Sequence, residues 1–422
     1  MTSVRIAPGR AAGTVLAPPS KSYTHRALVA AHLSGRTYRI VDPLDSEDTR
    51  ATARAISALG TPVRRRKNIW TVTPQESEPA EALITIDCGE SGTTWRFATA
   101  LAARLGTRVA LGGRGRLPAR PMAELLSALR TLGADCRQDP ARGVVTIRGP
   151  IHSGSVALDA SRSSQFASAL LFVLPTLDDG SVLRLTGPIV SGPYIEATVA
   201  LLARHRVRVT REGRKFQVPG GQTYRGSRFR PTGDASSAAY LWTAAALTGG
   251  EVKVEGVDPD WPQADRAILP LLEQTGAGVI RARRSATVRG RALHPFRVDL
   301  SGAPDLYPLA GVLAASIPGR SEIRGAAHVE LKESDRRAAT ADLARAFGAR
   351  VSVFSDRMVI EGTSEPRAVH RTDLADHRLV MSAAVGALSA GTASTLGNAR
   401  AVEKSFPGFW TALGELTGRH SS

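Results

Sequence analysis

The strongest constraint on the fold is a pattern that recurs about every 72 residues along the chain. Each copy has an apolar, helix-like stretch, then in most copies a glycine, then a β-branched or other small residue three positions later. A glycine directly after a helix supplies a left-handed cap, so that a strand can follow at once. Six near-equal units predict a repeated supersecondary element. The copies centre on Gly60, Gly133, Arg206, Gly276, Gly348 and Gly414, at intervals of 73, 73, 70, 72 and 66 residues.

The repeated unit contains strands as well as helices. Strand-like stretches at residues 144–147, 182–185 and 252–254 fall between the helical ones. A unit of this length is too long for a helical solenoid repeat. We therefore predict an α/β protein of six similar units, with three in each of two domains. Residues 218–233, rich in glycine, are the best internal linker.

The composition indicates a globular cytoplasmic protein. The chain has 422 residues, of which 42% are hydrophobic, enough for two or three domain cores. There is no run of about 18 apolar residues that would span a membrane, and residues 1–10 lack the layout of a secretory signal. The two cysteines, Cys88 and Cys136, are too few for a disulfide framework and show no metal-ligand spacing. We expect no metal site.

The chain carries a formal charge of +17. Of its 55 basic residues 6 are lysine, which leaves 49 arginines. Such an excess suits nucleic acid, an anionic membrane or small anionic substrates, or reflects an arginine-rich solvated surface. The basic residues do not form one tract with interleaved aromatics, as single-strand binding surfaces do. Three of the six lysines, Lys21, Lys332 and Lys404, lie in the polar motifs described next.

Common catalytic and nucleotide-binding motifs are missing from the sequence. It has no GxxxxGK[ST], HExxH or GxSxG, and Gly113-x-Gly115 lacks the third glycine of a dinucleotide fingerprint. Short polar motifs instead adjoin apolar stretches. Taken singly, a serine before a helix is an ordinary cap, although such helix starts also bind anions. The motifs are residues 19–26 (PSKSYTHR), 87–96 (DCGESGTTWR), 120–121 (RP), 163–165 (SSQ), 191–194 (SGPY), Asp305, 332–336 (KESDR), 376–378 (DHR) and 404–407 (KSFP).

Together, and in this order, the motifs resemble those of the EPSP synthase family. The family signatures SKSxxxR, GTxxR, SSQ, KExDR, DHR and KxFP are all matched, and the resemblance runs from about residue 13 to residue 416. It implies the two-domain enolpyruvyl transferase fold, with six βαβαββ units, three per domain, in agreement with the periodicity. It also implies a discontinuous domain of residues 1–16 and 232–422, and an inserted domain of residues 17–231.

The family reaction belongs to the shikimate pathway of aromatic amino acid biosynthesis. It joins phosphoenolpyruvate to the 5-hydroxyl of shikimate 3-phosphate, by addition and then elimination through a tetrahedral intermediate, and gives EPSP and phosphate. The resemblance implies no metal and no organic cofactor. The two small-molecule substrates carry two phosphates and two carboxylates, which converging Arg and Lys side chains recognise. We expect a monomer that binds neither nucleic acid nor membrane.

The resemblance also implies a role for each motif residue. Asp305 is the expected base for the 5-hydroxyl, while Glu333 and Lys21 exchange a proton with the methylene carbon. The expected ligands of shikimate 3-phosphate are Lys21, Ser22, Arg26, Ser163, Ser164, Gln165, Ser191, Tyr194, Asp305 and Lys332. Those of phosphoenolpyruvate are Lys21, Gly92, Arg120, Gln165, Lys404 and, at the carboxylate, Arg336 and Arg378.

Three other functions remain open at this point. The sister enzyme UDP-N-acetylglucosamine 1-carboxyvinyltransferase has the same fold, but its mobile loop usually carries a cysteine, and the corresponding residues 112–121 have none. A specialised paralogue acting on another cyclic hydroxy acid would keep most of the motifs. A nucleic-acid-binding protein is suggested by the charge, and affinity retained at about 200 mM salt would support it.

Overall fold

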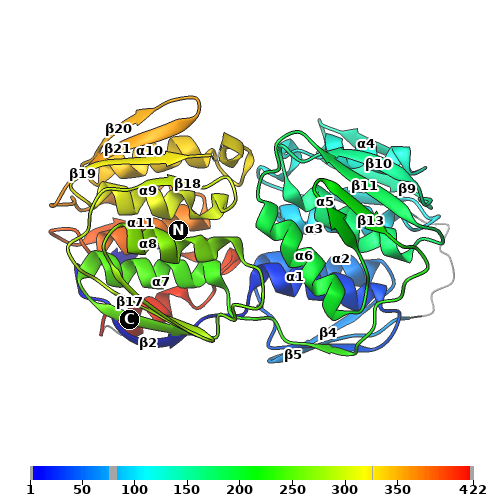
Figure 1. The fold of residues 1–422 in the computed structure, drawn as a ribbon, viewed down its shortest axis with the longest axis horizontal. Helices are drawn as coiled ribbons and strands as arrows, with labels where there is room; N and C mark the ends of the chain where they lie inside the picture. Colours follow the sequence, from blue (N-terminus) through cyan, green and yellow to red (C-terminus); the bar gives the residue numbers. More distant parts are fainter. Residues whose placement is uncertain (1–2, 76–82, 326, 419–422) are drawn as a thin grey trace. The chain divides into compact units, whose positions relative to one another are not determined.

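The strands form six sheets in the part of the chain that the structure describes, and five of these sheets share one strand order. The structure is a computed structural model that describes residues 3–75, 83–325 and 327–418. The chain folds into two units (Figure 1). Unit 1 consists of Met1–Pro18 and Thr232–Ser422, and unit 2 consists of Pro19–Pro231. Each unit contains three of the sheets.

One sheet of unit 2 shows the common order. It contains β6 (Ile84–Asp87), β7 (Val109–Gly112), β9 (Val144–Arg148) and β8 (Asp135–Asp139), in that order. β6 is parallel to β7, β7 is antiparallel to β9, and β8 pairs with β9 at the edge. Parallel neighbours need a crossover helix, whereas the antiparallel pair needs only a short turn. This order therefore requires a βαβαββ unit.

Four more sheets repeat the order. Two of them are completed by a strand from a distant part of the sequence: β14 lies parallel to β3, and β2 lies parallel to β15. In unit 2, one of these sheets has the order β14 (Arg228–Phe229), β3 (Tyr38–Val41), β5 (Ile69–Val72) and β4 (Val63–Arg66). The other has the order β10 (Ser155–Asp159), β11 (Ser181–Thr186), β13 (Lys215–Val218) and β12 (Thr210–Glu212). In unit 1, one sheet has the order β2 (Ala12–Leu16), β15 (Glu251–Glu255), β17 (Ser285–Arg289) and β16 (Gly278–Ala282). The other has the order β18 (Arg297–Asp299), β19 (Gly319–Arg324), β21 (Arg357–Gly362) and β20 (Arg350–Val353). The sixth sheet, also in unit 1, has three strands: β1 (Val4–Ile6), β23 (Ser394–Leu396) and β22 (His370–Arg371).

The predicted α/β fold is confirmed, with five full copies of the repeated sheet and a sixth sheet of three strands, and the predicted strands lie within β9, β11 and β15. Five of the six marked positions end a helix with a positive φ, and Arg206 (φ 57°) adopts this conformation although it is not glycine. The sixth position was wrong. Gly414 lies inside helix α12 (Phe409–Leu416), and Gly418 (φ 67°) follows that helix instead.

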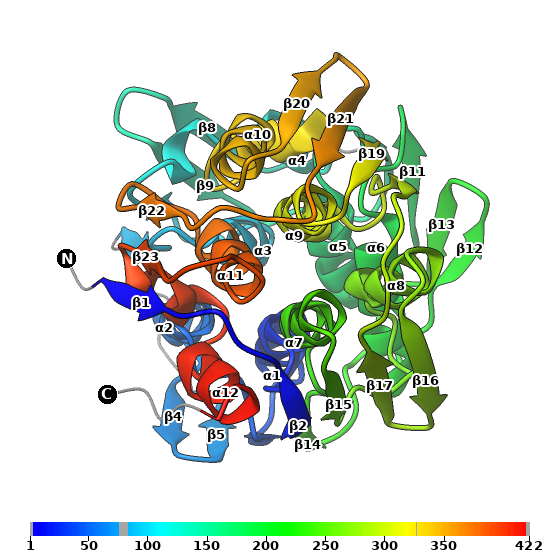
Figure 2. The ribbon, with the colours of Figure 1, turned by 90° about the vertical axis from the view of Figure 1, so that its left-hand side faces the viewer.

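Three helices form the centre of each unit, and the apolar character of their sequences explains why they are buried there. In unit 1 the inner helices α7, α9 and α11 pack together (Figure 2). All residues of α9 are buried, as expected for a helix that is apolar on every side. In unit 2 the inner helices are α1, α3 and α5. The inner helices are α1 (Lys21–Leu33), α3 (Gly92–Ala102), α5 (Ser164–Val173), α7 (Ala235–Thr248), α9 (Tyr307–Ala315) and α11 (His377–Ala387). Besides α12, the other described α-helices are α2 (Glu47–Ala58), α4 (Ala123–Thr131), α6 (Gly192–Arg204), α8 (Ile268–Gln274) and α10 (Arg336–Ala346).

Short 3₁₀ helices connect several elements, and some of them carry motif residues. They are η1 (Leu117–Ala119), η2 (Leu174–Thr176), η3 (Ala264–Ala267), η4 (Pro304–Leu306), η5 (Ala327–Leu331) and η6 (Ala399–Lys404). Among the described residues, no helix combines the length and apolar character needed to cross a membrane.

Candidate active site

The inner helices of unit 2 begin inside the polar motifs. Lys21, Gly92 and Ser164 are the first residues of α1, α3 and α5. The starts of α3 and α5 lie together, because Gln165 Nε2 donates to Thr93 Oγ1 at 3.0 Å. A helix N-terminus carries a partial positive charge and free N–H groups, so neighbouring starts form an anion-binding region.

Two guanidinium groups lie over Gly92. A Cβ atom on this residue would lie 2.7 Å from Arg120 Cζ and 2.9 Å from Arg96 Nη1. Arg96 donates to Gln165 Oε1 at 2.6 Å and to the Pro121 carbonyl at 3.0 Å. The structure therefore brings together Gly92, Arg120 and Gln165, three of the residues predicted to bind phosphoenolpyruvate, and only glycine leaves room for the two cations.

Lys21 and Arg26 are both held by protein groups. Lys21 Nζ lies 3.0 Å from Asp48 Oδ2, on α2. Arg26 is 2% exposed and donates to Thr198 Oγ1 at 2.9 Å and to the Tyr194 carbonyl at 2.7 Å. Burial lowers the pKa of Arg26 to about 10, which leaves it protonated at neutral pH. Arg26 thus ties α1 to α6, in addition to its predicted role toward shikimate 3-phosphate.

The remaining predicted residues of unit 2 lie at the starts of α1, α5 and α6. Ser22 is the second residue of α1, and its carbonyl accepts from Arg26 at 3.0 Å. Ser163 caps α5 by accepting from the Gln165 N–H at 3.2 Å, which is the ordinary capping role. Ser191 precedes α6 with a left-handed backbone (φ 55°), and Tyr194 lies in the first turn of that helix.

In unit 1, Arg336 is the centre of a cluster of carboxylates. Its side chain is 1% exposed, and each of its three nitrogens donates to a different acid. The acceptors are Asp376 Oδ2 at 2.7 Å from Nε, Asp305 Oδ1 at 2.7 Å from Nη1, and Glu333 Oε2 at 2.8 Å from Nη2. Burial lowers the pKa of Arg336, but these carboxylates outweigh burial and hold the pKa above its ordinary value.

Asp305 is held between two arginines. Its second oxygen, Oδ2, accepts from Arg378 Nη2 at 2.6 Å, and Lys332 Nζ lies 3.8 Å from Oδ1. Burial raises the pKa of Asp305, but Arg378, Lys332 and Arg336 outweigh it and hold the pKa well below its usual range. In this arrangement the predicted base is a weak base. The two arginines predicted to bind the carboxylate of a substrate, Arg336 and Arg378, here donate hydrogen bonds to the carboxylate of Asp305.

The starts of the inner helices also meet in this unit. Asp305 precedes α9 and Arg378 is the second residue of α11, whose cap Asp376 accepts from the Arg378 N–H at 2.9 Å. The predicted residues Asp305, Lys332, Glu333, Arg336 and Arg378 are therefore brought together. The remaining predicted residue of this unit, Lys404, is the last residue of η6 and is 8% exposed.

Sequence reasoning missed several residues of these clusters. Asp376 and Arg96 lie inside matched motifs but were given no role, so the motifs could have signalled them. Asp48 and Asp265 lie outside the quoted motifs. Only folding brings Asp48 to Lys21, and Asp265 to Asp305 and Arg378. Asp265 is buried on η3, where burial raises its pKa to about 6, with Asp305 adding to the shift and Arg378 opposing it.

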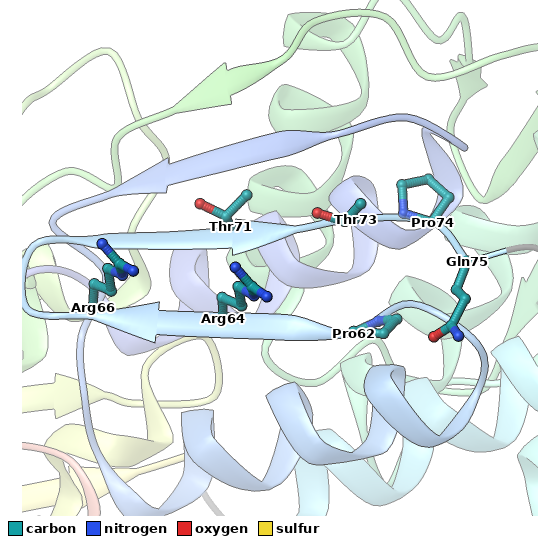
Figure 3. A pocket seen from close by; sticks show the side chains of 7 residues that line it. All are labelled: Pro62, Arg64, Arg66, Thr71, Thr73, Pro74 and Gln75. Carbon is teal, nitrogen blue, oxygen red and sulfur yellow. The ribbon is translucent and has the colours of Figure 1, made fainter.

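A separate cavity of about 630 Å³ lies over the β4–β5 hairpin. Figure 3 shows Arg64, Arg66, Thr71 and Thr73 on the side of the hairpin that lines it. It contains none of the predicted site residues. Within the described parts of the chain, no group of three or more His, Cys, Asp or Glu side chains is arranged to hold a metal ion.

Comparisons with known proteins indicate the same family as the sequence motifs. A family model described as EPSP synthase (3-phosphoshikimate 1-carboxyvinyltransferase) matches residues 6–413. The 3-phosphoshikimate 1-carboxyvinyltransferase of Methanocorpusculum labreanum is 38% identical over 398 residues, which is 94% of each chain. That of Thermococcus kodakarensis is 40% identical over 405 residues, or 96% of this chain and 97% of the relative. The solved structure of EPSP synthase from Acinetobacter baumannii has a TM-score of 0.82 and 24% identity over 99% of both chains, a likeness of fold.

Proposed function

The chain belongs to the EPSP synthase family, and we propose that it transfers the enolpyruvyl group of phosphoenolpyruvate to the 5-hydroxyl of shikimate 3-phosphate. The observation that carries this proposal is the pair of buried arginines, Arg336 and Arg378, closed on one carboxylate. Paired guanidinium groups recognise planar carboxylates through charge-assisted hydrogen bonds. We further propose a cytoplasmic monomer that acts on these two small molecules and not on nucleic acid.

In the addition step, the 5-hydroxyl oxygen bonds to C2 of phosphoenolpyruvate and the methylene carbon gains a proton. Asp305 removes the hydroxyl proton, while Glu333 or Lys21 delivers the proton to carbon. In the elimination step the methyl group returns a proton, the bond from C2 to the phosphate oxygen breaks, and phosphate leaves. Fixed cations stabilise the charge on the leaving phosphate, for which we assign Lys21, Arg120 and the start of α3 at Gly92.

The contacts of Asp305 support an ordered activation. The carboxylate of phosphoenolpyruvate competes with Asp305 for Arg336 and Arg378. When it binds, it neutralises these cations and releases Asp305 from the bonds that keep its pKa low. The Asp305 carboxylate then becomes a stronger base only while phosphoenolpyruvate is bound, which is when the reaction needs a base.

Release of phosphate tests the function. We expect the purified chain to release phosphate when phosphoenolpyruvate is mixed with shikimate 3-phosphate, and not with UDP-N-acetylglucosamine. Arg378→Ala should raise the KM for phosphoenolpyruvate by about ten-fold or more, because it loses a charged hydrogen bond. Arg345→Ala, which changes an exposed arginine of α10 paired with Asp342, is the matched control and should have no effect. Phosphate release only with the nucleotide sugar, or with neither acceptor, would reject the proposal.

A further inference from the structure

Four buried polar side chains connect the first three helices of unit 2. His25 Nδ1 on α1 lies 2.7 Å from Thr52 Oγ1 on α2, and Thr52 Oγ1 lies 2.7 Å from Thr94 Oγ1 on α3. Thr94 Oγ1 lies 2.8 Å from the oxygen of Ser91, the residue that caps α3. The four side chains are at most 2% exposed. We call His25, Thr52, Thr94 and Ser91 the relay.

Proton counting gives the relay a direction. Thr94 has one hydroxyl proton, which it donates to Ser91 Oγ or to the Asp48 carbonyl at 3.3 Å. Its oxygen must then accept from Thr52, and Thr52 in turn accepts from a proton on His25 Nδ1. The other ring nitrogen, Nε2, is buried and makes no hydrogen bond within the described residues. A buried N–H without an acceptor is rarer than an unused acceptor, which also favours the proton on Nδ1.

The direction of the hydrogen bonds in the relay does not change with pH, because the His25 imidazole stays neutral. Burial lowers the pKa of His25 to about 3, with Lys21 and Arg26 adding to the shift and Asp48 opposing it. The ring therefore does not gain a proton between about pH 5 and pH 8, where an ordinary histidine titrates. His25 cannot act as a proton shuttle in this range, and its remaining property is a fixed N–H donor.

The relay adjoins the helix starts that carry proposed phosphate ligands. Lys21 precedes His25 by four residues and so lies on the same side of α1. Its partner Asp48 precedes Thr52 by four residues on α2. Gly92 directly follows Ser91. An apolar side chain would fill the place of His25 without a buried polar nitrogen that lacks a partner, so packing alone does not explain the histidine.

We propose that His25 is a positioning residue, whose Nδ1–H sets the direction of the relay and thereby holds Lys21 and the start of α3 in place for a substrate phosphate. The assignment to phosphoenolpyruvate rests on the proposed function. The direction of the relay does not.

Imidazole ¹⁵N NMR tests the direction without substrate or turnover. In protein labelled at histidine, we expect the His25 signals of a ring protonated at Nδ1 and not at Nε2. Because the ring stays neutral, these signals should not move between about pH 5 and pH 8. His25→Asn identifies the signals by their loss. A proton on Nε2, or a titration within this range, would overturn the proposal.

Kinetics test the positioning role. His25→Leu removes the donor, whereas His25→Asn offers an amide N–H near the place of Nδ1. We expect His25→Leu to raise the KM for phosphoenolpyruvate by about ten-fold, the equivalent of one hydrogen bond. The KM for shikimate 3-phosphate should rise by less, because Lys21 is an expected ligand of both substrates but the start of α3 at Gly92 is assigned to phosphoenolpyruvate alone. His25→Asn should restore most of the loss. Thr52→Val should match His25→Leu, and the double variant should be no worse than either, because both cut the same relay.

Two results would reject the role: equal impairment of the Asn and Leu variants, or equal changes in both KM values. Either indicates a general structural loss. If the wild-type chain shows no turnover with the two substrates, the proposed function fails, and the NMR result still decides the direction of the relay.

Discussion

Replacement of Asp305 by asparagine separates its two roles as internal anion and as base. In the structure Asp305 accepts bonds of 2.7 Å from Arg336 and 2.6 Å from Arg378. A hydrogen bond to a charged group contributes about 1.5–3 kcal/mol. The asparagine side chain would keep an oxygen for one arginine but lose the charge, so a competing substrate carboxylate would gain about one such bond. We therefore expect Asp305→Asn to bind phosphoenolpyruvate roughly 10- to 100-fold more tightly.

The same variant should lose at least about 100-fold in turnover, because the amide cannot accept the hydroxyl proton. Isothermal titration calorimetry without acceptor measures the affinity, and phosphate release measures the turnover. Asp342→Asn, which removes an exposed acid of α10 paired with Arg345 at 3.0 Å, is the control and should change neither. An unchanged or weaker affinity of a folded Asp305→Asn protein would refute competition between Asp305 and the substrate carboxylate.

Three further changes test other parts of the two clusters. Glu333→Gln should lower turnover by at least about 100-fold with little change in affinity for shikimate 3-phosphate, if the residue transfers a proton; near-normal steady-state turnover would leave it only as a partner of Arg336. Gly92→Ala should raise the KM for phosphoenolpyruvate by about ten-fold or more, because the new methyl group would lie 2.7 Å from Arg120 Cζ; an unchanged KM would contradict this placement. Asp265, whose pKa burial raises to about 6, favours the folded state when neutral, and this contribution is lost as the pH rises from about 4, where the unfolded carboxyl titrates, to about 6. In urea unfolding, Asp265→Asn should therefore gain stability relative to wild type at about pH 8 compared with about pH 5, and equal differences at both pH values would contradict the shift.

The repeat pattern predicted the fold because it reports local chain geometry. A left-handed residue after each helix and a following strand are determined by neighbours in sequence, and five of the six positions have that conformation. The pattern failed at Gly414 because a glycine inside an apolar stretch is compatible with either a helix interior or its end, and here the helix continues to Leu416. The two strands β2 and β14 could not be assigned to sheets from the repeat. Their parallel partners, β15 and β3, are more than 180 residues away.

By itself the sequence determined which residue types stand at the helix starts: Lys21, Gly92, Arg336 and Arg378 belong to motifs that are contiguous in the chain. Only the tertiary structure decided what each of them contacts. Asp305 lies 73 residues from Arg378, and the bond between them lowers the pKa of the acid and makes it compete with substrate. A charge interaction depends on distance in space and on burial, and neither is encoded by spacing along the chain. The neutral state of His25 has the same origin, because its pKa is set mainly by the removal of water around the ring.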